Sequence, residues 1–110
     1  MVFDKMGTTI IVSQKESSLS VFFDNFKEKY ETINSDNVIV DLTFFKELKT
    51  TQILRFLDIS NEHRNSNKSF VLVSDVVSFE DIPEEICLVP TIQEAKDIIE
   101  MEEIERDLGL

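Results

Sequence analysis

Few side chains of this 110-residue chain have the types and spacing that catalysis or metal binding needs. His63 is the single histidine and stands in a polar stretch, so we expect it at an exposed helix end without a nucleophile or metal partner. Four carboxylates close together could form an acid/base or cation site, but a solvated helix face is the favoured interpretation; they are Glu100, Glu102, Glu103 and Glu105. With only two glycines, a glycine-rich phosphate loop is excluded. The sequence therefore predicts a protein without enzyme activity, metal or cofactor.

Two hydroxyl side chains, Thr50 and Thr51, stand where a helix is expected to begin. A threonine at such a place can cap the free backbone N–H groups of the helix. Lys49 precedes them, and Phe44 and Phe45 lie in the loop before, where exposed aromatic side chains can anchor a protein partner. We therefore predict a partner-binding surface around this loop.

The charge is strongly negative, since 22 acidic residues face 11 basic ones and give a net charge of −11. Residues 76–110 carry 11 of the acids and only Lys96 and Arg106 as bases. Such a chain repels nucleic acids and anionic lipids, and a protein with a basic surface is the expected partner. In the last helix, Glu100, Glu103 and Asp107 are spaced by three and four residues and predict an outward acidic ridge, with Ile104 on the inner face.

The elements that would position these residues follow from hydrophobic periodicity. Apolar, β-branched runs predict strands at residues 2–6, 8–13, 38–42, 69–74 and 86–89. Three- and four-residue spacings predict helices at about 18–33, from 50 or 51 to about 60, and 91–108. This order predicts an α/β fold with a mixed, mostly parallel sheet of four to five strands and helices packed on one face.

The bulk properties predict one domain over residues 1–110, located in the cytoplasm, because no basic head with a long apolar stretch and no membrane-spanning run is present. The lone Cys87 lies in an apolar run and is interpreted as a small buried hydrophobe. Nine phenylalanines are expected to fill the core, although they could also line a pocket, so a small lipid-binding protein remains the alternative function.

The segment VIVDL, a loop, a helix and then SFVLV resembles the central part of STAS proteins, the anti-sigma-factor antagonists. In that family an Asp-Ser-Ser-Gly segment begins the helix, and one of its serines is phosphorylated by a partner kinase. Residues 49–52 stand there in this chain, so the resemblance implies that Thr51 occupies the phosphoacceptor position, with Thr50 beside it. It also implies a STAS-like fold, a regulatory role through protein binding and a possible homodimer.

The ending PTIQEAKDIIEMEEIERDLG is similar to that of short bacterial proteins sometimes labelled ribonuclease Z. Metal-dependent hydrolases of that kind hold two metals with an HxHxDH cluster, for which this chain has His63 alone. The resemblance therefore implies an accessory protein associated with the nuclease, without nuclease activity of its own.

Overall fold

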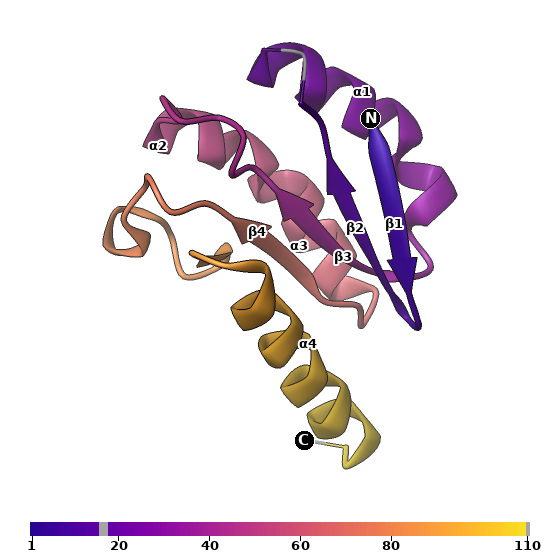
Figure 1. Ribbon diagram of the computed structural model, residues 1–110. Coiled ribbons are helices and arrows are strands. Elements are labelled where there is room, and N and C mark those ends of the chain that lie inside the picture. The colour runs from indigo at the N-terminus through magenta and orange to yellow at the C-terminus, as the bar shows by residue number, and fades with distance from the viewer. Residues whose placement is uncertain (16–17, 110) are drawn as a thin grey trace.

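A single five-stranded sheet forms the centre of the protein, which we describe from a computed structural model covering residues 1–15 and 18–109 (Figure 1). Its strands, in spatial and in chain order, are β1 (Val2–Met6), β2 (Thr9–Ser13), β3 (Asn37–Asp41), β4 (Phe70–Val73) and β5 (Cys87–Val89). β1 and β2 form an antiparallel hairpin, and β2 to β5 pair in parallel. The predicted α/β class and the mostly parallel sheet are confirmed.

The hairpin turn depends on Gly7, which adopts a positive φ of 61° that a residue with a Cβ rarely takes. The turn places Met6 opposite Thr9 and Val2 opposite Ser13, so β1 becomes the outer strand of the sheet. All five residues of β1 are exposed.

Helices follow β2, β3 and β5 along the chain. They are α1 (Leu19–Ile33), α2 (Thr50–Ile53), α3 (Leu57–Asn65) and α4 (Ile92–Asp107), with short 3-10 turns at Leu54–Phe56 and Phe79–Asp81. Ser18 caps α1 by accepting from the Val21 N–H, and Thr91 caps α4 by accepting from the Glu94 N–H at 3.1 Å. The Thr91 cap was predicted; it orients the first turn of α4 after the last strand.

The core is divided into two layers by the sheet, so the prediction that the helices pack on one face is wrong. α1, the Leu54–Phe56 turn and α3 cover one face, where the fully buried large side chains include Phe22, Phe26, Phe56, Phe70 and Leu72. α4 covers the other face through Ala95 and Ile99, which pack on Ile39, Val71 and Val73 (Figure 1). The physical reason is that β3 and β4 are apolar on both faces, and one helical layer would leave half of those side chains in water.

Candidate functional site

The loop that follows β3 is held in place by its own backbone and side chains. The carboxylate Oδ1 of Asp41 accepts from the Thr43 N–H at 3.0 Å and from the Thr43 hydroxyl at 2.6 Å, which turns the chain away from the sheet. The Phe45 N–H then donates to the Leu42 carbonyl at 3.0 Å. Leu48 is buried and fixes the far end of the loop. The segment is therefore an ordered platform at the carboxyl end of the parallel strands.

The helix that begins at this platform is capped differently from the prediction. Its N-cap residue is Lys49, whose N–H donates to the side-chain oxygen Oε1 of Gln52 at 2.9 Å, and neither threonine hydroxyl takes the capping position. Thr51 is exposed, as the sequence predicts, and Thr50 is half-buried. The Gln52 side chain binds the Lys49 N–H, and the helix start is formed without a hydrogen bond from Thr51.

The two aromatic residues of the loop have different environments. Phe45 packs inward against Phe22, with ring centroids 5.8 Å apart, and is half-buried against the core. Phe44 meets Phe45 edge-to-face at 5.6 Å and remains 49% exposed. Phe44 is therefore the aromatic side chain of the pair that a partner can bury, while Phe45 fixes its position.

A shallow groove of about 650 Å³ lies over the start of α2, lined by Leu19 and by residues of the loop. Phe45, Lys49 and Thr51 all contribute to it, so the structure brings together these three predicted site residues. Phe44 lines a neighbouring hollow of about 460 Å³ with Asp41 and Lys46. We call the surface formed by Phe44, Phe45, Lys46, Lys49 and Thr51 the loop surface; its part in binding stays a prediction.

The predicted acidic ridge on α4 is interrupted. Glu100 and Asp107 are exposed, but Glu103 is half-buried because its Oε2 accepts from the Thr8 hydroxyl at 2.7 Å and from the Asn37 amide at 3.1 Å. Ile104, expected on the inner face, is 53% exposed. The outward position assigned to Glu103 and the inward position assigned to Ile104 are both wrong, because the inner face meets polar groups at this end of the sheet.

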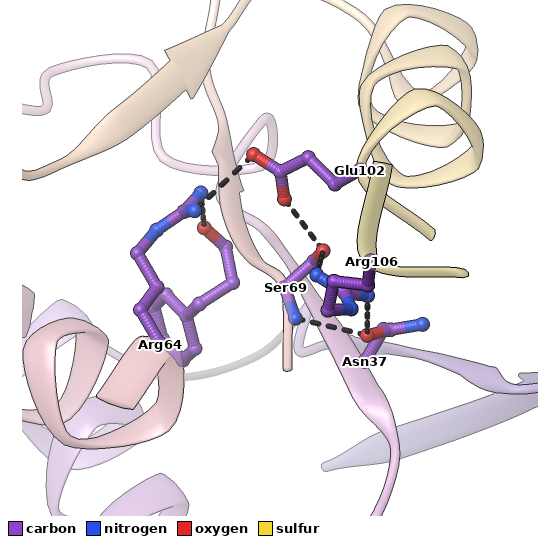
Figure 2. Close-up of polar contacts among 6 residues, drawn as sticks. Asn37, Arg64, Ser69, Glu102 and Arg106 are labelled. Atoms are coloured by element: carbon purple, nitrogen blue, oxygen red, sulfur yellow. Dashed lines mark hydrogen bonds and ion pairs between the residues drawn. The ribbon is translucent and has the colours of Figure 1, made fainter. Parts of the chain in front are cut away.

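Those polar groups form a network that sequence reasoning missed, at the amino ends of β3 and β4 (Figure 2). Asn37 is buried, and its Oδ1 accepts from the Ser69 N–H at 2.9 Å and from Arg106 at 3.2 Å. The Ser69 hydroxyl donates to Glu102, and Arg106 donates back to that hydroxyl at 3.2 Å. The carboxyl-terminal half of α4 is thereby fastened to the sheet.

Arg64 of α3 completes this network from the edge of the sheet. Its guanidinium donates to Glu102 at 3.2 Å and to the carbonyl of Phe70 at 3.0 Å, so it links α3, β4 and α4 (Figure 2). We call the group Asn37, Arg64, Ser69, Glu102, Glu103 and Arg106 the polar network. It is a structural contact rather than a reactive site, since its donors and acceptors satisfy one another.

His63 was expected at an exposed helix end, and this prediction is wrong. Its ring is fully buried, with Nε2 2.8 Å from the carbonyl oxygen of Asp36 and Nδ1 2.7 Å from the hydroxyl of Tyr30. A carbonyl only accepts, so Nε2 carries the proton and Nδ1 accepts from Tyr30. Burial lowers the pKa of His63 below its ordinary value, which keeps the ring neutral.

Other chemistry finds little support among the described residues. Across residues 1–15 and 18–109, no group of three or more His, Cys, Asp or Glu side chains is arranged to hold a metal ion. Burial raises the pKa of the half-buried Cys87 thiol, as suits a small apolar side chain. Phe22, Phe26, Phe56 and Phe70 are fully buried in the core. None of the helices described has the length and apolar character to cross a bilayer.

Comparisons with known proteins identify solved structures of similar fold. No protein-family model and no curated protein sequence matches the chain. A serine-to-glutamate variant of RsbS from Moorella thermoacetica matches with a TM-score of 0.58 and 13% identity, over 89% of this chain and 95% of that one. A structure described as the molecular architecture of the stressosome, a signal integration and transduction hub, matches with a TM-score of 0.59 and 12% identity, over 90% and 96%. The fold is therefore STAS-like, and the resemblance to proteins labelled ribonuclease Z gains no support.

Proposed function

We propose that residues 1–110 form one STAS-like domain that acts in the cytoplasm as a non-enzymatic regulatory module and binds a protein partner, in the manner of an anti-sigma-factor antagonist. The fold supports this proposal, since the similar solved structures include RsbS and the stressosome, the latter described as a signal integration and transduction hub. The matches span almost the whole of both chains, so the likeness concerns a complete domain.

The single observation that carries the proposal is the exposed Thr51 hydroxyl beside Phe45 and Lys49 on the loop surface. The exposed aromatic side chain of the loop surface is Phe44, and its exposed cations are Lys46 and Lys49. Such a combination is suited to protein recognition. The hydroxyl stands at the position that phosphorylation would modify in the STAS family. A phosphate there adds a charge of about −2 next to Lys49 and Lys46, and so changes which partner surface fits.

The chain departs from the family pattern around Thr51, and this bears on the enzyme that would modify it. Lys49 replaces an acidic residue, and Gln52 replaces a glycine that leaves the backbone accessible. Gln52 is also occupied as the acceptor of the Lys49 N–H. A kinase acting on Thr51 therefore has to recognise a basic rather than an acidic residue two positions before the threonine.

Affinity capture with variant proteins tests this proposal. Immobilised wild-type protein and the Thr51→Asp and Phe44→Ala variants are exposed to extract of the source cells, with Thr32→Asp, an exposed threonine of α1, as the matched control. We expect at least one protein to be retained by the wild type and the control and reduced at least about tenfold by Phe44→Ala, the loss of one well-buried anchor. Thr51→Asp should change the same protein's retention.

Native mass spectrometry of the purified protein separates the proposal from the alternative of a lipid carrier. The expected spectrum contains the protein without a stoichiometric apolar ligand. A bound lipid together with a capture that no substitution on the loop surface changes would replace the first function by the second.

A further inference from the structure

The outward face of α4 carries an apolar stripe that the core does not use. Met101, Ile104 and Leu108 are 61%, 53% and 68% exposed. At about 100° per residue, their spacing of three and four places them on one side of the helix, roughly opposite Ala95 and Ile99. Exposed apolar residues in a contiguous row are more informative than the same residues scattered singly, because they mark a surface that another molecule can cover.

Free carboxylates border this stripe on both sides. Glu100 and Asp107 lie along one side and Glu105 along the other, and all three are exposed. None of them has an ion-pair or side-chain hydrogen-bond partner among residues 1–15 and 18–109. Glu102 and Glu103, by contrast, face the polar network. The outward carboxylates are therefore available to cations from outside the chain.

A hollow of about 540 Å³ adjoins the stripe at Ile104 and extends to the amino ends of the strands. Its charged lining comprises Asp36, Lys68, Glu100, Glu103, Arg106 and Asp107. Lys5 already pairs with Asp36 at 3.4 Å, and Arg106 donates to Asn37 and Ser69 beneath the helix. Among the described residues, the charged side chains of this lining without an ion pair or side-chain hydrogen bond are consequently Glu100, Asp107 and the half-buried Lys68. Both such groups on α4 are acids, and the space is large enough for one Lys or Arg side chain.

The surface is held in a fixed shape before any partner arrives. The polar network ties Glu102, Glu103 and Arg106 on the inner side of α4 to the sheet, which sets the rotation of the helix and keeps the stripe outward. A preformed surface loses little conformational entropy on binding.

We propose that this stripe docks an amphipathic helix of another protein, with Lys or Arg residues beside apolar residues spaced by three and four. The proposal rests on the proposed function and names a second surface and the chemistry of its partner. Charge complementarity selects this occupant: the acidic borders attract a basic helix and repel both a second copy of a chain with a net charge of −11 and an anionic membrane. Apolar anchors supply affinity, and the charges set the orientation.

Selection from an unbiased library tests the partner's chemistry. Wild-type protein is used as bait for phage-displayed random 16-residue peptides, with the Met101→Ser/Ile104→Ser protein as counter-bait. The control protein, Val21→Ser/Val76→Ser, loses two exposed apolar side chains elsewhere. Melting curves by circular dichroism verify that all three proteins are folded. We expect enriched peptides to carry a net positive charge and apolar residues at helical spacing.

The dominant peptide is then synthesised and its affinity measured by fluorescence anisotropy. Met101→Ser/Ile104→Ser should weaken binding at least about tenfold, the loss of one hot spot, and the Val21→Ser/Val76→Ser control should bind as the wild type does. Glu100→Gln/Asp107→Asn should slow association at low salt, with the difference shrinking as salt is raised; Glu28→Gln/Glu31→Gln on α1 is its control.

Three results would overturn the docking proposal. They are a selection without peptides that distinguish wild type from the stripe variant, enriched peptides without net positive charge, and a wild-type dimer that Met101→Ser/Ile104→Ser converts to monomer in sedimentation. The last would assign the stripe to a second copy of the chain. Each leaves the capture experiment with Thr51→Asp unaffected, so failure of this surface and failure of the loop surface are told apart.

Discussion

The two ends of the parallel sheet use their polar residues in opposite ways. At the carboxyl end, the loop surface leaves Lys49, Thr51 and half of Phe44 in contact with solvent. At the amino end, the polar network satisfies its donors and acceptors internally and fastens α4 over the strands. One end therefore contributes to stability and the other is free to contribute to binding.

The contrast between the two ends is tested most directly by truncating one side chain at each end and measuring the stability of the protein. Asn37→Ala takes away the acceptor of the buried Ser69 N–H and a partner of Arg106 and Glu103, so we expect a loss of about 2–3 kcal/mol in the free energy of unfolding. Thr51→Ala should change it by less than about 0.5 kcal/mol. Urea unfolding followed by circular dichroism measures both. Equal losses would show that the loop surface is also structural.

The amino end should also respond to pH through His63. Because burial lowers the pKa of this ring in the folded protein, the unfolded chain binds more protons below the ordinary pKa of about 6.5. The stabilisation from neutral His63 is complete above that pH and is lost as the pH falls below it. The stability advantage of wild type over His63→Leu should therefore shrink between pH 7 and 5 in urea unfolding. An advantage independent of pH would contradict the buried, neutral ring.

The smallest expected effect is the difference in stability between variants at two glutamates of α4. Glu103→Gln weakens the acceptor of the Thr8 hydroxyl and the Asn37 amide, which should cost about 1 kcal/mol. Glu100→Gln removes an exposed acid that lies three residues from both Asp97 and Glu103, so relief of like-charge repulsion should leave stability equal or raise it by a few tenths of a kcal/mol. The melting temperatures of the two variants report the difference. A more harmful Glu100→Gln would reverse the assignment of inner and outer faces.

Much of the fold was predictable because the spacing of the apolar residues indicates which segments are strands and which are helices. The period-two and period-3.6 patterns placed all five strands and the long helices, with Ser18 and Thr91 at helix starts. The sequence also indicated that both faces of the sheet need to be covered, because strands such as residues 70–73 are apolar throughout. The error was to place all the helices on one side of strands that need cover on two.

The residues that sequence reasoning misplaced are polar side chains on inner faces. His63 continues the spacing of Phe56 and Ile59, which is a visible signal, but hydrophobicity ranks a histidine as a surface residue. On α4 the inner positions Ala95 and Ile99 continue to Glu102 and Arg106 by the same periodicity. A hydrophobicity scale instead assigns the apolar Ile104 to the inner face, although its side chain is exposed. The charged groups of α4 lie on the inner face because Asn37, the first residue of β3, and Ser69, just before β4, present polar groups to them.

The spatial order of the strands, which repeats their order in the chain, has a kinetic consequence. Each strand pairs with the one synthesised just before it, so no pairing has to wait for a strand that lies further along the chain. The longest connection to be closed is residues 42–69, between β3 and β4. The sheet can grow strand by strand as the polypeptide leaves the ribosome. α4 is the last of these elements in the chain, so until it docks, the apolar side chains Ile39, Val71 and Val73 face water on the nascent chain. Docking of α4, whose first turn is capped by Thr91, therefore removes an apolar surface through which nascent chains could aggregate.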